Sequence, residues 1–199
     1  MIHPSTKLEF ISDDKGYGVV ATEFIPRGTI TWVQDKLDKE LTPNDVIQLG
    51  NEYVSTIETY SFRNHLGNYI LCWDLGRFVN HSFHSNCLTT PYNFEIAIRD
   101  IQKGEELTDD YGYLNISEPF LALDEGSERK VVFPDDIIRM HPEWDDKLKN
   151  AFPLIEDVEQ PLSQFLLDDI SQTVREILKG EKKLDSIINC YYEKEKCYC

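Results

Sequence analysis

The stretch Gly76-Arg77-Phe78-Val79-Asn80-His81-Ser82 places a polar trio directly after two apolar residues. Asn80, His81 and Ser82 therefore enter or adjoin an apolar core, where each polar side chain needs a hydrogen-bond partner. Most such trios satisfy one another. The Asn80 amide can both donate and accept, so the trio could equally bracket a nitrogen heterocycle such as adenine.

Two other segments belong with this one: Lys15-Gly16-Tyr17-Gly18-Val19 and Gly104-Glu105-Glu106-Leu107-Thr108-Asp109-Asp110-Tyr111-Gly112-Tyr113. The two glycines of the first lie between strand-like runs with no helix after them, so the phosphate-binding turn of a dinucleotide fold does not apply. A hairpin turn is the ordinary interpretation, although glycines also let a ligand approach the backbone closely. The tyrosines alone are ordinary strand residues. Only the combination indicates a site.

The surrounding sequence predicts mostly β structure up to Tyr113. Short apolar runs closed by turn residues between Lys7 and Trp32 predict strands, as do residues 69–73 and 94–98. Thr42-Pro43-Asn44-Asp45 predicts the start of a helix, with Thr42 as its cap.

After Asn115 the pattern changes. A polar stretch punctuated by prolines runs to Pro161, beyond which apolar residues recur at helical spacing until Gly180. A second helix is expected after it, carrying Leu184, Ile187, Ile188 and Tyr191. We therefore predict a domain over residues 1–114 and an extension over 115–199 that is helical from about 161. The apolar stripe must be buried, either within one chain or in a homodimer.

Composition restricts the partners. The net charge is −16, and residues 1–114 and 115–199 each carry −8. Such a surface repels phosphate backbones and attracts basic partners, which disfavours direct nucleic-acid binding. No stretch approaches the ~20 apolar residues of a membrane helix, and the first residues do not read as a signal peptide. We expect an intracellular protein, cytoplasmic or nuclear, with reduced cysteines.

In this order and at this spacing, the three segments resemble the SET-domain family of protein-lysine methyltransferases. The family signatures are a GxG turn, an RFxNHS segment and a GEELxxDYGY-like segment, and the resemblance covers residues 7–114. It implies a mostly β fold of small curved sheets, in which the strand with Asn80 and the segment with Tyr111 form a knot-like crossing. The helical extension lies outside the resemblance.

The resemblance also implies a pocket for S-adenosylmethionine (SAM) on one face and a lysine channel on the other. Tyr111 matches the tyrosine at the meeting point of lysine nitrogen and cofactor methyl, and Tyr60 matches a second aromatic wall. The implied cofactor-binding residues are Gly16, Tyr17, Gly18, Arg77, Asn80 and His81.

Two positions depart from the family pattern. Phe83 stands where the family often has a zinc-binding cysteine, and the C-terminal spacing of Cys190, Cys197 and Cys199 is irregular. Cys87 could complete a four-thiolate site with them, but the spacing makes zinc doubtful and we assign no metal ligand. Asp109 stands where the family commonly has an aromatic or aliphatic residue. An acid there could hold a water or meet a second basic residue of the substrate.

The sequence therefore predicts a SAM-dependent methyltransferase acting on a lysine of a basic protein, such as a histone. The alternative is a SET-like module that binds a peptide or SAM without turnover. A zinc-organised scaffold without a cofactor would depend on the cysteines alone.

Overall fold

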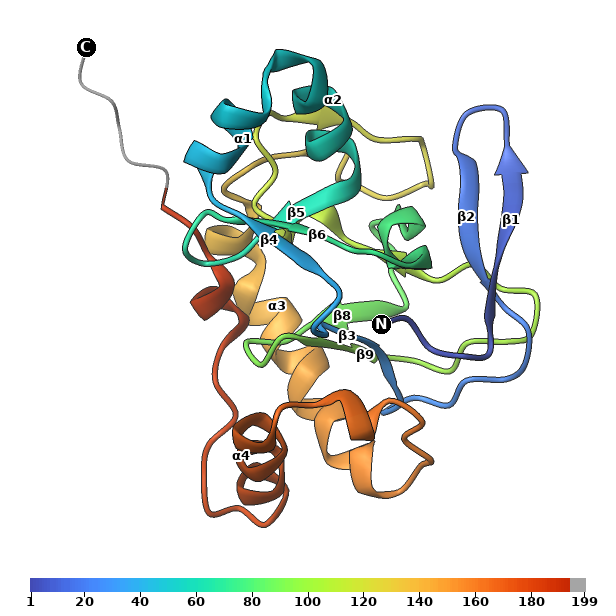
Figure 1. Ribbon diagram of the computed structural model, residues 1–199. Coiled ribbons are helices and arrows are strands. Elements are labelled where there is room, and N and C mark those ends of the chain that lie inside the picture. The colour runs from blue at the N-terminus through green and yellow to red at the C-terminus, as the bar shows by residue number, and fades with distance from the viewer. Residues whose placement is uncertain (194–199) are drawn as a thin grey trace.

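The fold is built from several small sheets, and the computed structural model describes it over residues 1–193 (Figure 1). A hairpin of β1 (Thr6–Ser12) and β2 (Gly16–Ala21) stands at one side of the molecule. The central sheet has the order β3 (Ile30–Val33), β9 (Phe94–Ala97), β8 (Cys87–Thr89). A second sheet has the order β4 (Lys39–Leu41), β6 (Tyr69–Leu71), β5 (Ser61–Arg63). β11 (Phe120–Leu121) and β12 (Val131–Val132) form a short antiparallel pair.

The central sheet is buried on both faces, which explains why its strands lack a clean alternation of apolar and polar residues. All four residues of β3 and all four of β9 are buried. Ile30, Phe94 and Ile96 face one apolar cluster, whereas Trp32 and Ala97 face another. The sheet thus separates two halves of the core.

Two short helices connect β4 to β5. The predicted helix start is confirmed: α1 (Pro43–Leu49) is capped by Thr42, whose Oγ1 accepts from the Asp45 amide at 3.1 Å while Asp45 Oδ2 accepts from the Thr42 amide. This reciprocal pair is a capping box. α2 (Asn51–Tyr60) follows after Gly50, whose φ of 103° suits glycine, and delivers Tyr60 to the start of β5.

The strand with Asn80 and the segment before Tyr111 lie side by side, as the resemblance implies. β7 (Asn80–His81) pairs in parallel with β10 (Thr108–Asp109), with Asn80 opposite Thr108 and His81 opposite Asp109. The 3₁₀ helix η1 (Leu75–Phe78) precedes β7, and the 3₁₀ helix η2 (Tyr111–Tyr113) follows β10. The mostly β arrangement of small sheets is confirmed.

The extension is helical from an earlier point than predicted. α3 (Asp136–Ala151) begins well before residue 161 and is followed by the 3₁₀ helix η3 (Phe152–Glu156). Sequence reasoning missed α3 because Pro142 lies inside it and removes one intrahelical hydrogen bond, which ordinarily argues against a helix. Burial of Trp144 and Leu148 against the domain outweighs that cost.

The later part of the extension agrees with the prediction only in part. η4 (Ser163–Phe165) and α4 (Asp168–Leu178) carry most of the predicted apolar stripe, of which Val174 and the preceding Leu162 are buried. The prediction of a second helix after Gly180 is wrong. Residues 181–186 are not helical, and only the 3₁₀ helix η5 (Ile187–Cys190) follows, packed on α3. There the Ile187 amide donates to Asp145 of α3 at 2.8 Å, a tertiary contact that sequence periodicity does not record.

The extension buries its apolar residues against the central sheet of the same chain. One continuous cluster contains Ile30, Phe94 and Ile96 of the sheet together with Phe152 and Ile187 of the extension. Within residues 1–193, none of the helices is both long enough and apolar enough to cross a membrane.

Candidate active site

A cleft of about 1040 Å³ opens between the β1–β2 hairpin, the end of α2 and the segment that follows η2. Its volume lies at the upper end of the range of small-molecule pockets, roughly 300–1,000 Å³. Six of the eight predicted site residues line it: Gly16, Tyr17, Tyr60, Arg77, Asn80 and Tyr111.

A smaller inner cavity of about 120 Å³ adjoins the cleft. Tyr60, Arg77 and Tyr111 line both spaces. The inner cavity continues toward the central sheet, where it is lined by Trp32, Cys72, Glu95 and Asp109. Tyr111 therefore lines both the larger cleft and the smaller cavity.

Two hydrogen bonds hold Tyr111 in place, one at its hydroxyl and one at its backbone amide. Its Oη donates to the Val79 carbonyl oxygen at 2.7 Å, and its backbone amide donates to His81 Nδ1 at 3.1 Å. Burial raises the pKa of the Tyr111 hydroxyl, so the group stays protonated at neutral pH. A protonated phenol can donate a hydrogen bond but cannot act as a base.

His81 lies behind Tyr111 and does not line the cleft. Burial lowers the pKa of His81, which keeps the ring neutral. Because Nδ1 accepts from Tyr111, the ring proton is on Nε2, which is buried and has no hydrogen-bond partner within residues 1–193. The rings of Phe83 and Phe120 pack on His81 at centroid distances of 4.5 Å and 5.5 Å.

Asn80 connects the cleft to the β1–β2 hairpin. Its Nδ2 donates to the Tyr17 carbonyl oxygen at 3.0 Å and to Glu106 Oε1 at 2.7 Å. A Cβ at Gly18 would lie 2.4 Å from Glu106 Oε1 and 2.8 Å from Asn80 Nδ2. Gly18 is therefore needed so that this internal contact can form.

Glu106 is a residue that sequence reasoning missed. It lies in the third motif, but it was given no role there. In the structure it accepts from Asn80 and forms an ion pair with Lys15 Nζ at 3.0 Å. Glu106 therefore connects all three motifs through these contacts. Its place in the third motif, two residues after Gly104, was the sequence signal that could have indicated a role in the site.

Tyr60 and Arg77 also line the cleft. The Tyr60 ring packs edge-on against Phe78 with centroids 5.6 Å apart, while Phe62 packs against Trp32 in the core. Arg77 is exposed on η1 and forms no ion pair with any residue from 1 to 193. Its guanidinium is available to an anionic group in the cleft.

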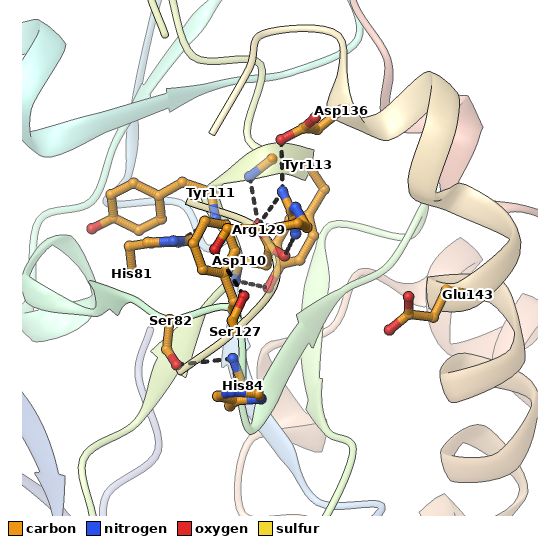
Figure 2. Close-up of polar contacts among 12 residues, drawn as sticks. His81, Ser82, His84, Asp110, Tyr111, Tyr113, Ser127, Arg129, Asp136 and Glu143 are labelled. Carbon is orange, nitrogen blue, oxygen red and sulfur yellow. Dashed lines mark hydrogen bonds and ion pairs between the residues drawn. The ribbon is translucent and has the colours of Figure 1, made fainter. Parts of the chain in front are cut away.

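A charged network behind the η2 segment fixes the direction of Tyr111 (Figure 2). Asp110 Oδ1 accepts from the Gly112 amide at 3.0 Å, which caps η2. Arg129 of the extension is bonded to Asp110 and, at 2.6 Å, to Asp136 at the start of α3. A Cβ at Gly112 would lie 2.9 Å from the Cβ of Asp136, so only glycine fits there.

The cysteines give no sign of a metal centre in the part of the chain that is described. Cys72 and Cys87 are buried free thiols, and burial raises the pKa of both. Within residues 1–193, no cluster of three or more His, Cys, Asp or Glu side chains could hold a metal ion. Cys197 and Cys199, the other candidates for zinc, lie outside the described residues.

Comparison with known families bears on the class of protein. A sequence model of the family described as "SET domain" matches residues 16–112. This match, which covers just under half of the chain, confirms the SET-domain segment that the three motifs predicted.

The relatives found by comparison carry histone-lysine methyltransferase names. The chain is 30% identical over 128 residues to histone-lysine N-methyltransferase ASHH2 of Arabidopsis thaliana, covering 54% of this chain and 7% of the relative. It is 31% identical over 148 residues to histone-lysine N-methyltransferase SETMAR of Bos taurus, covering 61% and 46%. It is 32% identical over 149 residues to the Homo sapiens SETMAR, covering 61% and 21%. The chain thus spans less than half the length of these relatives.

A solved structure is also similar. The methyltransferase domain of human histone-lysine N-methyltransferase SETMAR matches 58% of this chain and 47% of its own, with 25% identity and a TM-score of 0.43.

Proposed function

We propose that this protein transfers a methyl group from SAM to a lysine of a basic protein. The observation that carries the proposal is the position of Tyr111 between the wide cleft and the narrow inner cavity. A cosubstrate in the cleft and a lysine side chain in the cavity would meet at this residue. Alignment of the two reactants is then a large part of the rate acceleration.

The cleft residues suit the chemistry of SAM, which supplies an activated methyl group when bound. Arg77 offers a cation to its carboxylate. Glu118 and Glu58 line the same cleft and would offset the positive sulfonium and ammonium groups. The open turn at Gly16, where a Cβ would meet nothing within 4 Å, leaves the backbone accessible.

The inner cavity suits a lysine side chain. An exposed lysine with a pKa near 10.4 is almost fully protonated at pH 7, so forming the neutral amine costs about 4–5 kcal/mol. Burial beside Trp32 and Tyr111 disfavours the ammonium and lowers that cost. The Tyr111 hydroxyl and the Val79 carbonyl oxygen are polar groups beside this cavity that can orient the amine.

A basic protein substrate would complement the net charge of the chain, which is −16. The relatives named as histone-lysine methyltransferases support a histone as one such substrate. With this substrate class we place the protein in the nucleus or cytoplasm.

The test is incubation of the purified protein with methyl-labelled SAM, first with core histones and then with a cell extract. We expect label on a lysine of a basic protein, located by mass spectrometry, and a loss of label with Tyr111→Phe. Label on no protein, with SAM binding intact by calorimetry, would instead support a SET-like module that binds without turnover.

A further inference from the structure

Two carboxyl groups line the smaller cavity together with Tyr111. Glu95 on β9 and Asp109 on β10 both line it, and these residues are 8% and 3% exposed. Side chains alternate along β9, so Glu95 faces away from Phe94 and Ile96, which pack on the extension side of the sheet. Neither carboxyl group forms an ion pair within residues 1–193.

The two carboxyl groups lie close enough to influence each other's pKa, and Asp109 Oδ1 also accepts from the Tyr113 hydroxyl at 2.7 Å. Burial raises the pKa of Glu95 well above its usual value, and burial raises the pKa of Asp109 to about 6. Two adjacent buried carboxyl groups cannot both ionise readily. The pair therefore holds one proton and one negative charge at neutral pH.

Within residues 1–193 no ion pair neutralises this charge, although Arg63 and Arg77 line the same cavity. Asp110 forms an ion pair with Arg129, and the N-terminal ammonium of Met1 is the smallest of the influences on the pKa of Glu95. Other titratable groups near the pair include Tyr111, Tyr113, Cys72 and Cys87, and His81 lies opposite Asp109 in the paired strands. Burial raises the pKa of the two thiols and of both phenols, so they are neutral and cannot act as bases at pH 7.

Trp32 adds a further polar group to the same cavity. Its Nε1 is buried and has no hydrogen-bond partner among residues 1–193, while Trp32 lines the cavity with the two acids. A buried donor without a partner is costly unless a ligand or water supplies an acceptor. The cavity is therefore lined by polar groups as well as by aromatic rings.

We propose that the Glu95–Asp109 pair accepts the proton that the substrate lysine must lose before it is methylated. The inference rests on the function proposed above. One N–H bond of the lysine ammonium breaks and its electrons remain on nitrogen as the lone pair. The proton forms an O–H bond with the ionised carboxylate, so the pair changes from −1 to neutral and the lysine from +1 to neutral. After the methylated product leaves, the pair releases the proton to water.

Two considerations favour the Glu95–Asp109 pair over solvent as the acceptor of the lysine proton. An acceptor works best when its pKa lies near the operating pH, and a carboxyl pair raised by burial meets that condition better than an exposed acid. A proton acceptor inside the cavity also removes the need for a hydroxide ion to enter a space of about 120 Å³.

The test uses the isosteric double variant Glu95→Gln/Asp109→Asn, which keeps the size of the two side chains and an acceptor for Tyr113 but removes both ionisations. Single-turnover methylation of the acceptor found above is measured from about pH 5 to about pH 10. In the parent we expect the rate to rise through about pH 6 and then level off, because Asp109 ionises there. In the double variant we expect a rate at pH 7 that is about ten-fold lower or more and that keeps rising with pH. Identical pH profiles would overturn the proposal.

Asp38→Asn is the matched control. Asp38 is also a buried acid whose pKa is raised by burial, but it does not line the cavity. We expect this variant to keep the parent pH profile, and SAM affinity measured by calorimetry should be the same in all three proteins. A profile shifted equally by Asp38→Asn would assign the effect to general electrostatics and overturn the specific role of the pair.

Infrared spectroscopy gives a readout that does not depend on turnover. The parent should show the band of a protonated buried carboxyl at pH 7.5 that the double variant lacks. Binding of a short arginine-rich peptide with a single lysine should increase this band, whereas its norleucine counterpart should not. Absence of the band, or an equal response to both peptides, would contradict the proposal even if no methylated substrate is found. A positive infrared result without any methyl transfer would count against the proposed function alone.

Discussion

The guanidinium of Arg129 forms an ion pair with Asp110, the residue directly before Tyr111. Arg129 belongs to the extension, and it also bonds Asp136 at the start of α3 (Figure 2). The segment that carries the proposed catalytic tyrosine is thus held by residues outside the three motifs. The rings of Tyr113 and Trp144, packed edge-on at 5.2 Å, strengthen the same connection.

Removal of this cation should destabilise the whole chain. Arg129→Met leaves the nearly buried carboxylates of Asp110 and Asp136 without a cation, and breaking such a buried pair costs about 3–5 kcal/mol. Urea unfolding measures the change. Lys130→Met is the control, because its partner Asp124 is fully solvent-exposed and the loss should leave stability unchanged. An equal effect in both variants would argue against a special role for Arg129.

Removal of the Asn80 amide should weaken SAM binding. Asn80→Ala breaks the contacts to the Tyr17 carbonyl and to Glu106, so the hairpin wall of the cleft loses its anchor. We expect an affinity loss of about ten-fold, equivalent to about 1.4 kcal/mol, by calorimetry. Asn150→Ala, an exposed change on α3, should bind SAM as the parent does. Unchanged affinity in Asn80→Ala would show that the cleft is not the SAM site.

Removal of the Tyr111 hydroxyl should separate binding from rate. Tyr111→Phe keeps the ring between the two cavities but loses the bond to the Val79 carbonyl. SAM affinity should stay close to that of the parent, while transfer should fall about ten-fold or more, equivalent to about 1.4 kcal/mol. Tyr53→Phe, exposed on α2, serves as the control. A Tyr111→Phe protein as active as the parent would refute the role given to this hydroxyl.

The extension should be indispensable for folding. Phe152 is 1% exposed and packs on the rings of Tyr92 and Phe94, so Phe152→Ala should cost about 3–5 kcal/mol in urea unfolding. Phe24→Ala, at a position that is 52% exposed, is the comparison and should change stability little. Truncation after Asn150 removes Phe152 altogether and should give an unfolded or insoluble protein. A truncated protein that stays stable and active would show that the extension is dispensable.

The acid pair should also change how the free energy of unfolding depends on pH. Because burial raises the pKa of Glu95 and Asp109 in the folded protein, protonation favours the folded state. The stabilising contribution is complete below the pKa of the unfolded chain, about 4, and is lost as pH rises through the folded value of Asp109, about 6. The unfolding free energy of the parent should therefore fall over this range relative to Glu95→Gln/Asp109→Asn. Parallel stability curves would show that the pair is not protonated in the fold.

The sequence by itself determined the features that depend on near neighbours or on motif order. Thr42 and Asp45 predict their capping box because the two residues lie three positions apart. The three motifs predict the fold through their resemblance to a family, and six of the eight candidate residues, Tyr60 outside the motifs among them, line one cleft. The helix start was predictable because turn chemistry and capping act over a few residues.

Only the tertiary structure decided which distant surfaces pack together. α3 forms despite Pro142 because Trp144 and Leu148 are buried against the domain. His81 lies behind Tyr111 rather than along the cleft, and Arg129 reaches Asp110 from beyond the motifs. Glu95 and Asp109 meet because β9 and β10 bring them to the same cavity. Their burial and hydrogen bonding, which set their protonation, are properties of that packing, and the spacing of residues along the chain does not contain them.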